Sequence, residues 1–409
     1  MKKKRNIAIF TGNRAEYGLQ YPILKAIDEH SKLDYCLLVS GAHLDNSFGK
    51  TLKEINRDGF KVSKEIKIKM TGDTLFDTTQ AIGNGIISIA KSLKEVKPDL
   101  LIVYADRFEG FAAIIAATQM NIPTAHIEGG DITEGGALDD SIRHAMTKLA
   151  HIHFTTNKFA TNRILAMGEE KWRVKTVGFP GVDLIKTKNF FNLKYIEKSL
   201  NLSVKKPIVI FTQHSVTTEF EEAPKQIKAS LIALKKLLTE NVQVIVTYPN
   251  NDAGGKVIIK EIEKWYKKNS HFKNLIVKKS LGKNLYYGVL NLAKNKNHKV
   301  VCCGNSSSGI KETPIFGCPT VNIGSRQKSR LRGTNIIDVD YNKKNIYESI
   351  NECFYNNIFR KKALETKNPY GIGKSGIKIA EFISLIKLDK KLLQKKMTIK
   401  GIKTKNWFR

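Results

Sequence analysis

Short apolar runs alternate with longer amphipathic stretches along most of the chain. The runs are three to six residues long, which is typical of strands buried on both faces. The first series of predicted strands comprises Ile7–Phe10, Tyr35–Val39, Leu100–Val103, Thr124–Ile127 and Ile152–Thr155. The second comprises Pro207–Phe211, Val242–Thr247, Leu275–Val277, Val300–Cys303 and Pro319–Ile323. Predicted helices between them include Tyr17–Glu29, Gly110–Met120, Ser141–Ala150 and Glu221–Leu238. Two such series predict an α/β fold with two doubly wound parallel sheets, divided near 184–206.

Composition supports a globular, intracellular protein. The chain has 409 residues, of which 41% are hydrophobic and 26% charged, so it is too apolar for a disordered chain. No run approaches the roughly 18 apolar residues of a membrane span. The basic start is followed only by Ile7–Phe10, too short for a secretory signal, so we expect a cytoplasmic protein. Five cysteines without a CxxC or His/Cys cluster predict neither disulfides nor zinc, and we expect no metal and no cofactor.

The net charge of +31 would suit a nucleic-acid binder. Lysines are, however, spread through the whole chain, and no nucleic-acid recognition motif accompanies them. The densest run, Lys387–Arg409, holds nine Lys or Arg against the single acid Asp389. We therefore expect a solvated basic surface and tail and no specific nucleic acid partner. Loose contact with an anionic membrane or polymer is the weaker alternative.

Polar clusters follow several predicted strands, at the edge where open α/β sheets bind ligands. In the second half, Ser306 and Ser307 lie in a small-residue turn between Val300–Cys303 and a predicted helix start. Free N–H groups and hydroxyls at such a junction favour phosphate binding, with a plain helix N-cap as the alternative. Walker A and GxGxxG sequences are absent, which argues against nucleotide triphosphate hydrolysis and dinucleotide binding.

Two arginines follow strands in similar turns. Arg14 lies after Ile7–Phe10 and Arg326 after Pro319–Ile323, and a guanidinium in either turn can bind a diphosphate through paired hydrogen bonds. For Arg14, an ion pair with Glu16 or a surface carboxylate is the alternative.

Three carboxylates, Asp106, Glu128 and Asp139, follow strand ends in the first half. Gathered together they could supply a general acid and a general base, whereas each alone could be an N-cap or a salt-bridge partner. Glu128 precedes Gly129-Gly130, where we expect the backbone to approach a ligand closely. His214 ends a strand of the second half and is a candidate proton donor or phosphate partner, with a structural role as the alternative.

In this order the clusters resemble a known family: the hydrolysing UDP-N-acetylglucosamine 2-epimerases of sialic and legionaminic acid biosynthesis. The resemblance runs from about Ile7 to about Glu381. The motifs that carry it in the first half are Arg14–Gly18, Gly41–Leu44, Asp106–Glu109, His126–Gly130 and Asp139–His144. Those in the second half are His214–Thr218, Gly304–Glu312 and Phe316–Gln327.

The resemblance implies a GT-B-like fold of two Rossmann-like domains with an interdomain cleft. It assigns 1–185 to the domain that carries the carboxylates and 206–365 to the domain that binds the nucleotide diphosphate. A helix within 366–388 crosses back, and 389–409 form the basic tail. It also implies a homo-oligomer, a dimer or a tetramer.

The implied reaction removes the C2 proton of the sugar and expels the nucleoside diphosphate, which gives a 2-acetamidoglucal to which water adds. By the resemblance, Asp106, Glu128 and Asp139 handle the proton and the water, and Arg143 orients them. The same resemblance gives Arg14, Ser306, Ser307, His214 and Arg326 to the leaving phosphates, and Glu312 to the ribose hydroxyls.

The acetamido sugar and the nucleotide, UDP or GDP, stay open. Glu128 and Asp139 are eleven positions apart, farther than in typical sialic-acid members, and Asp131–Gly136 looks closer to the legionaminic type. A GT-B glycosyltransferase with the same phosphate site is the main alternative, and a basic binding protein without enzymatic activity is the second.

Overall fold

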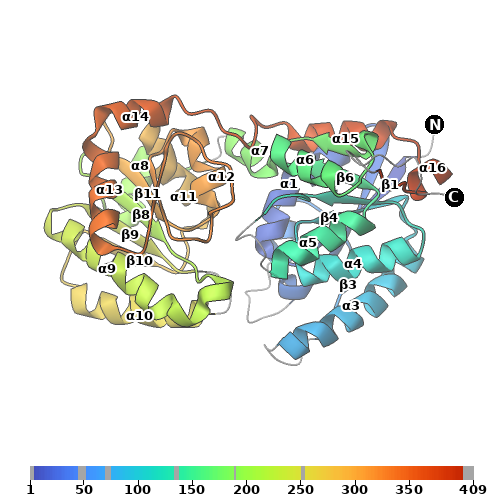
Figure 1. Cartoon of the computed structure of the whole chain (residues 1–409), viewed down its shortest axis with the longest axis horizontal. Coiled ribbons are helices and arrows are strands. Elements are labelled where there is room, and N and C mark those ends of the chain that lie inside the picture. Colours follow the sequence, from blue (N-terminus) through green and yellow to red (C-terminus); the bar gives the residue numbers. More distant parts are fainter. Residues whose placement is uncertain are drawn as a thin grey trace, which may run out of the picture. The chain divides into compact units, whose positions relative to one another are not determined.

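The computed structural model describes residues 4–44, 52–69, 75–132, 138–187, 190–249 and 254–398 (Figure 1). The described chain forms two compact units. Unit 1 contains 4–132, 138–184 and 371–398, and unit 2 contains 185–370. Each unit is built on one parallel sheet, so the predicted α/β class is confirmed.

The sheet of unit 1 has seven strands in the order β3-β2-β1-β4-β5-β6-β7. Its strands are β1 Arg5–Thr11, β2 Leu33–Ser40, β3 Val62–Ile66, β4 Leu100–Tyr104, β5 Thr124–Ile127, β6 Ile152–Thr155 and β7 Val174–Thr176. Its helices are α1 Arg14–Asp28, α2 Leu52–Arg57, α3 Leu75–Val96, α4 Phe108–Gln119, α5 Leu138–Leu149, α6 Lys158–Ala166, α7 Pro180–Lys186, α15 Ser375–Leu385 and α16 Lys390–Leu393, of which α7 ends just inside unit 2. Short 3₁₀ turns occupy Gly41–His43 and Lys171–Arg173.

The sheet of unit 2 has six strands in the order β10-β9-β8-β11-β12-β13. Its strands are β8 Ile208–Thr212, β9 Gln243–Thr247, β10 Leu275–Lys278, β11 Val300–Gly304, β12 Thr320–Ile323 and β13 Ile336–Val339. Its helices are α8 Leu193–Leu200, α9 Ala223–Thr239, α10 Gly255–Asn269, α11 Gly282–Asn291, α12 Ser308–Lys311, α13 Lys343–Tyr355 and α14 Asn357–Leu364. Short 3₁₀ turns occupy Thr217–Glu222, Leu292–Lys294 and Thr313–Phe316.

Helices cover both faces of each sheet, which explains the nearly continuous apolar strands. Within β1, Ile7 and Ile9 pack in a core with α1 and α15, whereas Ala8 and Phe10 pack with α3 and α4 on the other face. In unit 2, one face packs against α9, α10 and α13 and the other against α8 and α11. Apolar residues are therefore needed at every position of the central strands, not at alternate ones.

Helix α15 lies against α1 in unit 1. A β-carbon on Gly376 would lie 2.2 Å from the Pro22 carbonyl oxygen, so only glycine allows this approach. The Gly376 N–H donates to Asp183 Oδ2 at 2.9 Å. This hydrogen bond joins the start of α15 to α7.

The segment after α15 packs onto unit 1. Leu392 is fully buried, and the buried Arg173 donates to the backbone carbonyls of Leu392, Lys391 and Gln394. Lys395 Nζ lies 2.9 Å from Glu169 Oε2. Lys390 and Lys391 are exposed, as a solvated basic tail requires, whereas the buried Arg173 and Glu169 hold the backbone and Lys395 of this segment on unit 1. Residues 399–409 of the predicted tail lie outside the described residues.

All five cysteines are free and buried. Across the described ranges, no helix combines the length and the apolar character that a membrane crossing needs. The same ranges contain no group of three His, Cys, Asp or Glu able to hold a metal ion.

Candidate active site

Asp106 and Glu128 follow neighbouring strands of unit 1. β4 and β5 pair in parallel with Tyr104 opposite Ile127, so the residues just beyond them emerge at the same edge of the sheet. The Ala105 N–H donates to the Ile127 carbonyl at 2.9 Å, which extends the pairing by one residue. The two candidate carboxylates thus belong to one sheet edge, as the sequence predicts.

Glu128 is held in an unusual backbone conformation. Its φ is +64°, a left-handed value that costs a non-glycine residue about 1–3 kcal/mol. Its N–H donates to the Phe154 carbonyl at 3.0 Å, and the residue is only 7% exposed. The Tyr104 hydroxyl lies beside it: burial raises the pKa of Tyr104 well above its usual value, and the charges of Glu128 and Asp131 add to this rise.

Gly129 and Gly130 allow close packing against neighbouring parts of the protein. A β-carbon on Gly129 would lie 2.8 Å from the Thr147 hydroxyl and 2.9 Å from His126 Nδ1. On Gly130, whose φ is +74°, it would lie 2.4 Å from the Ala160 carbonyl oxygen. Packing against α5 and α6 is one reason for both glycines, and the expected close approach of a ligand to this backbone stays a prediction.

Arg143 joins the carboxylates of this edge through α5. It forms ion pairs with Asp106 and, at 3.2 Å, with Asp140, and its side chain is 5% exposed. Its positive charge stabilises negative charge on Asp106 in a poorly hydrated place. Asp139 lies in the first turn of the same helix and is exposed. Sequence reasoning missed Asp140, although its spacing of three from Arg143 places both on one face of a helix.

Arg14 is the first residue of α1, after the N-cap Asn13, whose side chain accepts from the Glu16 N–H. Glu16 itself is buried and accepts a hydrogen bond from the Gly12 N–H at 2.6 Å. Burial raises the pKa of Glu16 to about 8, with help from the nearby Glu109. The side chain of Arg14 lies outside the described part of the chain, so the suggested Arg14–Glu16 ion pair stays a prediction.

In unit 2, His214 follows β8 and is 6% exposed. Burial, together with the positive charge of Arg326, lowers the pKa of His214 to about 3. The imidazole is therefore neutral at physiological pH and has one N–H to donate. His214 and Arg326 come from the ends of β8 and β12, the two strands that flank β11.

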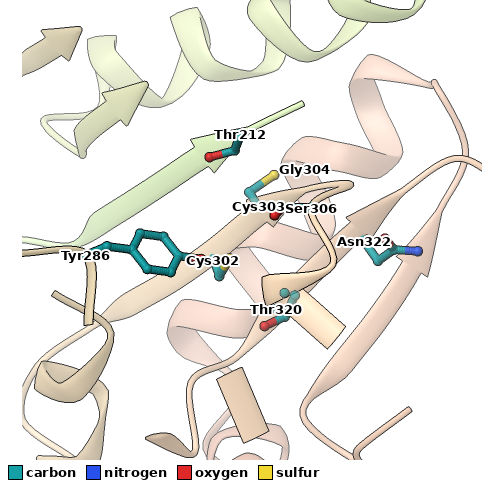
Figure 2. A pocket seen from close by; sticks show the side chains of 9 residues that line it. Thr212, Tyr286, Cys302, Cys303, Gly304, Ser306, Thr320 and Asn322 are labelled. Atoms are coloured by element: carbon teal, nitrogen blue, oxygen red, sulfur yellow. Dashed lines mark hydrogen bonds between the residues drawn. The ribbon is translucent and has the colours of Figure 1, made fainter. Parts of the chain in front are cut away.

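The serine turn follows β11, between those two strands. The helix after it, α12, has only four residues, so the predicted helix-dipole contribution is small. Ser306 lines a small cavity together with Thr212, Tyr286 and Cys302 (Figure 2). The cavity volume is about 10 Å³, enough for about one water molecule and too small for a nucleotide. Ser307 is the N-cap of α12.

Glu312 lies one helical turn beyond the serines. It accepts a hydrogen bond from the Ser308 hydroxyl, which also lies 2.9 Å from the Tyr286 hydroxyl. Burial raises the pKa of Glu312, while hydrogen bonds from Ser308 and Tyr287 oppose the rise. Ser308 is thus occupied by protein partners, which leaves Ser306 and Ser307 as the candidate phosphate contacts.

Each unit therefore gathers part of the predicted set at one sheet edge. Unit 1 brings together Asp106, Glu128 and Arg143, and unit 2 brings together His214, Ser306 and Arg326. Comparison with solved structures shows a GT-B-like fold. The UDP-GlcNAc 2-epimerase of Neisseria meningitidis, solved with UDP-GlcNAc bound, has a TM-score of 0.78 at 18% identity and covers 93% of this chain and 99% of that one. The Methanocaldococcus jannaschii enzyme, in complex with UDP-GlcNAc and UDP, has a TM-score of 0.72 at 21% identity with the same coverage of 93% and 99%.

Sequence comparison defines the family within that class. The UDP-N-acetylglucosamine 2-epimerase family matches residues 25–384. A hydrolysing GDP/UDP-N,N'-diacetylbacillosamine 2-epimerase of Campylobacter jejuni is 36% identical over 83% of this chain and 85% of its own length. A hydrolysing UDP-N,N'-diacetylbacillosamine 2-epimerase of Legionella pneumophila is 31% identical over 96% and 98%. The chain belongs to the UDP-N-acetylglucosamine 2-epimerase family, which supports the epimerase expectation and not the glycosyltransferase alternative.

Proposed function

We propose that the protein hydrolyses a UDP-linked 2-acetamido sugar with inversion at C2. The products are UDP and a free sugar of the N-acetylmannosamine type. The pairing of Arg143 with Asp106, on the sheet edge that also carries Glu128, is the observation that carries this proposal. Two carboxylates and a buried cation at one edge match a reaction that must move a proton from carbon and later activate water.

The first step breaks two bonds. The C2–H is weakly acidic because no carbonyl flanks it, so departure of the diphosphate from C1 must lead. The C1–O electrons leave with UDP, a carboxylate accepts the C2 proton, and a double bond forms between C1 and C2. In the second step, water adds its oxygen to C1, and a proton returns to C2 on the opposite face.

The residues divide according to these demands. Asp106, Glu128 and Asp139 exchange the protons, and each transfer contributes roughly 10²–10⁴-fold. Ser306, Ser307, His214, Arg326 and Arg14 stabilise the departing phosphates, where one well-placed donor contributes about 2.7–4 kcal/mol. Glu312 accepts from the ribose hydroxyls, and Arg143 holds Asp106 in place.

Two substrates follow from the names of the relatives: UDP-N,N'-diacetylbacillosamine, named in two hydrolysing relatives, and UDP-N-acetylglucosamine, named in the Neisseria meningitidis relative at 32% identity. The name of the Campylobacter jejuni relative includes GDP as well, so the test must compare UDP-linked with GDP-linked sugars. We further propose that the enzyme works in the cytoplasm. We also propose that it is a dimer or a tetramer, and light scattering of the purified chain would measure this oligomeric state.

The test is incubation of the pure protein in D₂O with each UDP- or GDP-linked sugar and no acceptor. We expect release of the nucleoside diphosphate and a free 2-epimeric sugar that carries deuterium at C2, seen by NMR. Retention of the original hydrogen at C2, or release of the nucleotide only with an added acceptor, would contradict the proposal.

A further inference from the structure

Asn305 is a fully buried residue between β11 and the candidate phosphate serines. Its side chain spans to the neighbouring strand end: Oδ1 accepts from the His214 N–H at 2.6 Å, and Nδ2 donates to the His214 carbonyl at 2.8 Å. A backbone N–H can only donate and a carbonyl can only accept, so the two bonds fix the orientation of the amide.

The hydrogen bonds between the Asn305 amide and His214 lie just beyond the point where the pairing of β8 and β11 ends. β8 and β11 pair in parallel as far as Thr212 and Gly304, and the Asn305 N–H donates to the Thr212 carbonyl at 3.1 Å. At Gly304 the backbone has a φ of +125°, and a β-carbon there would lie 1.9 Å from the Thr212 carbonyl oxygen. The strands separate beyond this point, and the Asn305 amide replaces the next pair of backbone hydrogen bonds to His214.

The backbone of Asn305 holds a third element. Its carbonyl accepts from Arg326 Nη1 at 3.3 Å and from Gln327 Nε2 at 2.9 Å. Gln327 is fully buried, so the loop after β12 is anchored at this carbonyl. One residue therefore contacts the chain at His214, at Arg326 and, through the peptide bond, at Ser306.

We propose that Asn305 is a positioning residue that sets the relative placement of His214, Ser306 and Arg326 for the nucleotide diphosphate. It acts through these side chains and is too buried to contact the substrate. The inference rests on the proposed function, because it assumes that these three groups bind the leaving phosphates. Donors must be fixed before the charge develops if they are to lower the barrier without reorganisation.

A purely structural role for a buried asparagine is the alternative, and the same unit offers a matched control. Asn335 is also fully buried, and its Nδ2 donates to the Cys318 carbonyl at 2.8 Å and to the Thr313 hydroxyl at 3.1 Å. It contacts none of the proposed phosphate ligands. Asn335→Ala therefore reports the effect of removing a buried amide from unit 2 without disturbing His214.

The experiment compares Asn305→Ala, Asn335→Ala and the wild type at a temperature where circular dichroism shows all three folded. We expect Asn305→Ala to lower kcat/KM on the order of 10²-fold, the effect of misplacing reacting groups by about 1 Å. UDP affinity, measured by calorimetry, should fall about 10-fold with it. Asn335→Ala should change both by less than about twofold. Equal losses in the two variants, or wild-type values for Asn305→Ala, would overturn the assignment.

Asn305→Asp supplies a second variant of the same shape. It keeps the acceptor for the His214 N–H but places an oxygen against the His214 carbonyl, so we expect a loss of UDP affinity in this variant too. If Asn305→Ala does not fold, Asn305→Asp takes its place in the comparison, with Asn335→Asp as the control.

A double-mutant cycle with His214→Ala separates positioning from general weakening. If Asn305 acts largely through His214, then Asn305→Ala should cost much less kcat/KM in the His214→Ala background than in the wild type. The same fold-loss in both backgrounds would contradict action through His214. Turnover by the wild type tests the proposed function, whereas the UDP affinity of the Asn305 variants tests the positioning role of Asn305. Either proposal can therefore be contradicted without the other.

Discussion

Two residues at the carboxyl ends of β4 and β5 have a strained backbone conformation. Ala105 and Glu128 both have positive φ, at +53° and +64°, and neither is glycine. His126 supports this geometry: its Nε2 lies 2.6 Å from the Ala105 carbonyl, and its Nδ1 lies 3.2 Å from the Thr147 hydroxyl. Backbone strain held by a buried side chain at two adjacent strand ends is the pattern expected of a reaction centre.

This strain supports a direct test of Glu128. Glu128→Gln keeps the size of the side chain but cannot accept a proton, so kcat should fall roughly 10²–10⁴-fold. UDP affinity should stay unchanged, because Glu128 is not one of the proposed phosphate ligands. The measurements are NMR of product formation and calorimetry with UDP. The exposed Glu29, replaced by Gln, is the matched control, and near-normal turnover in Glu128→Gln would refute the assigned role.

At the scale of elements, the sequence predicted the central strands better than the edges. All ten predicted strands are present within a residue or two, because full burial makes them continuously apolar. The three strands it missed, β3, β7 and β13, all lie at sheet edges. β3 reads Val-Ser-Lys-Glu-Ile, with mostly half-exposed or exposed residues, so it lacks the apolar signal. The helix predicted within 366–388 corresponds to α15.

The candidate site also contains some features that the sequence predicts and others that it does not. Strand ends can be read from the sequence, and parallel pairing then places Asp106 beside Glu128. Asn305 reaches His214 across 91 positions, and Arg173 reaches Leu392 across 219, so neither contact leaves a local pattern. Such partners are decided by packing, which one sequence does not display.

The segment after α15 depends on a buried ionic cluster that can be tested. Glu169 is 1% exposed and contacts Lys148 Nζ at 2.6 Å, Lys395 Nζ at 2.9 Å and His153 Nε2 at 3.0 Å. Burial alone would raise the pKa of Glu169, but these partners outweigh burial and lower it to about 2. The carboxylate is therefore the acceptor that holds Lys395 and its segment on unit 1.

Glu169→Gln removes the counter-charge of Lys395, whose side chain is 18% exposed, and of the partly exposed Lys148. We expect the free energy of unfolding at pH 7 to fall by about 1–3 kcal/mol, the usual cost of removing one partner from a buried hydrogen-bonded group. A lowered pKa contributes stability above the unfolded value of 4.5 that is lost as the pH falls toward 2, so the difference from wild type should shrink over that range. Urea denaturation measures it, with the exposed Glu65→Gln as the control. A difference that does not change with pH would rule out the charge as its cause.

For the whole molecule, buried histidines decide how stability depends on pH. Burial lowers the pKa of six of the nine histidines: to about 3 for His126 and His214, to about 4 for His43 and His151, and in the same direction for His144 and His153. Three carboxyl groups work in the opposite direction, because burial raises the pKa of Glu16, Asp183 and Glu312. Because the histidines outnumber these carboxyl groups, we expect the histidines to decide whether the free energy of unfolding rises or falls as the pH drops below neutral.

Between pH 6.5 and 4.5 the unfolded chain gains protons at its histidines, while the lowered pKa values keep His43, His126, His151 and His214 largely neutral in the folded chain. Each such histidine lowers the free energy of unfolding by about 1.4 kcal/mol per pH unit below its unfolded pKa. We therefore expect the melting temperature to fall steadily from pH 7 to pH 4.5, measured by differential scanning calorimetry at constant ionic strength. His126→Gln should flatten this dependence, whereas the exposed His271→Gln should leave it unchanged. A melting temperature that is constant or rises over this range would show that the three carboxyl groups, and not the histidines, dominate.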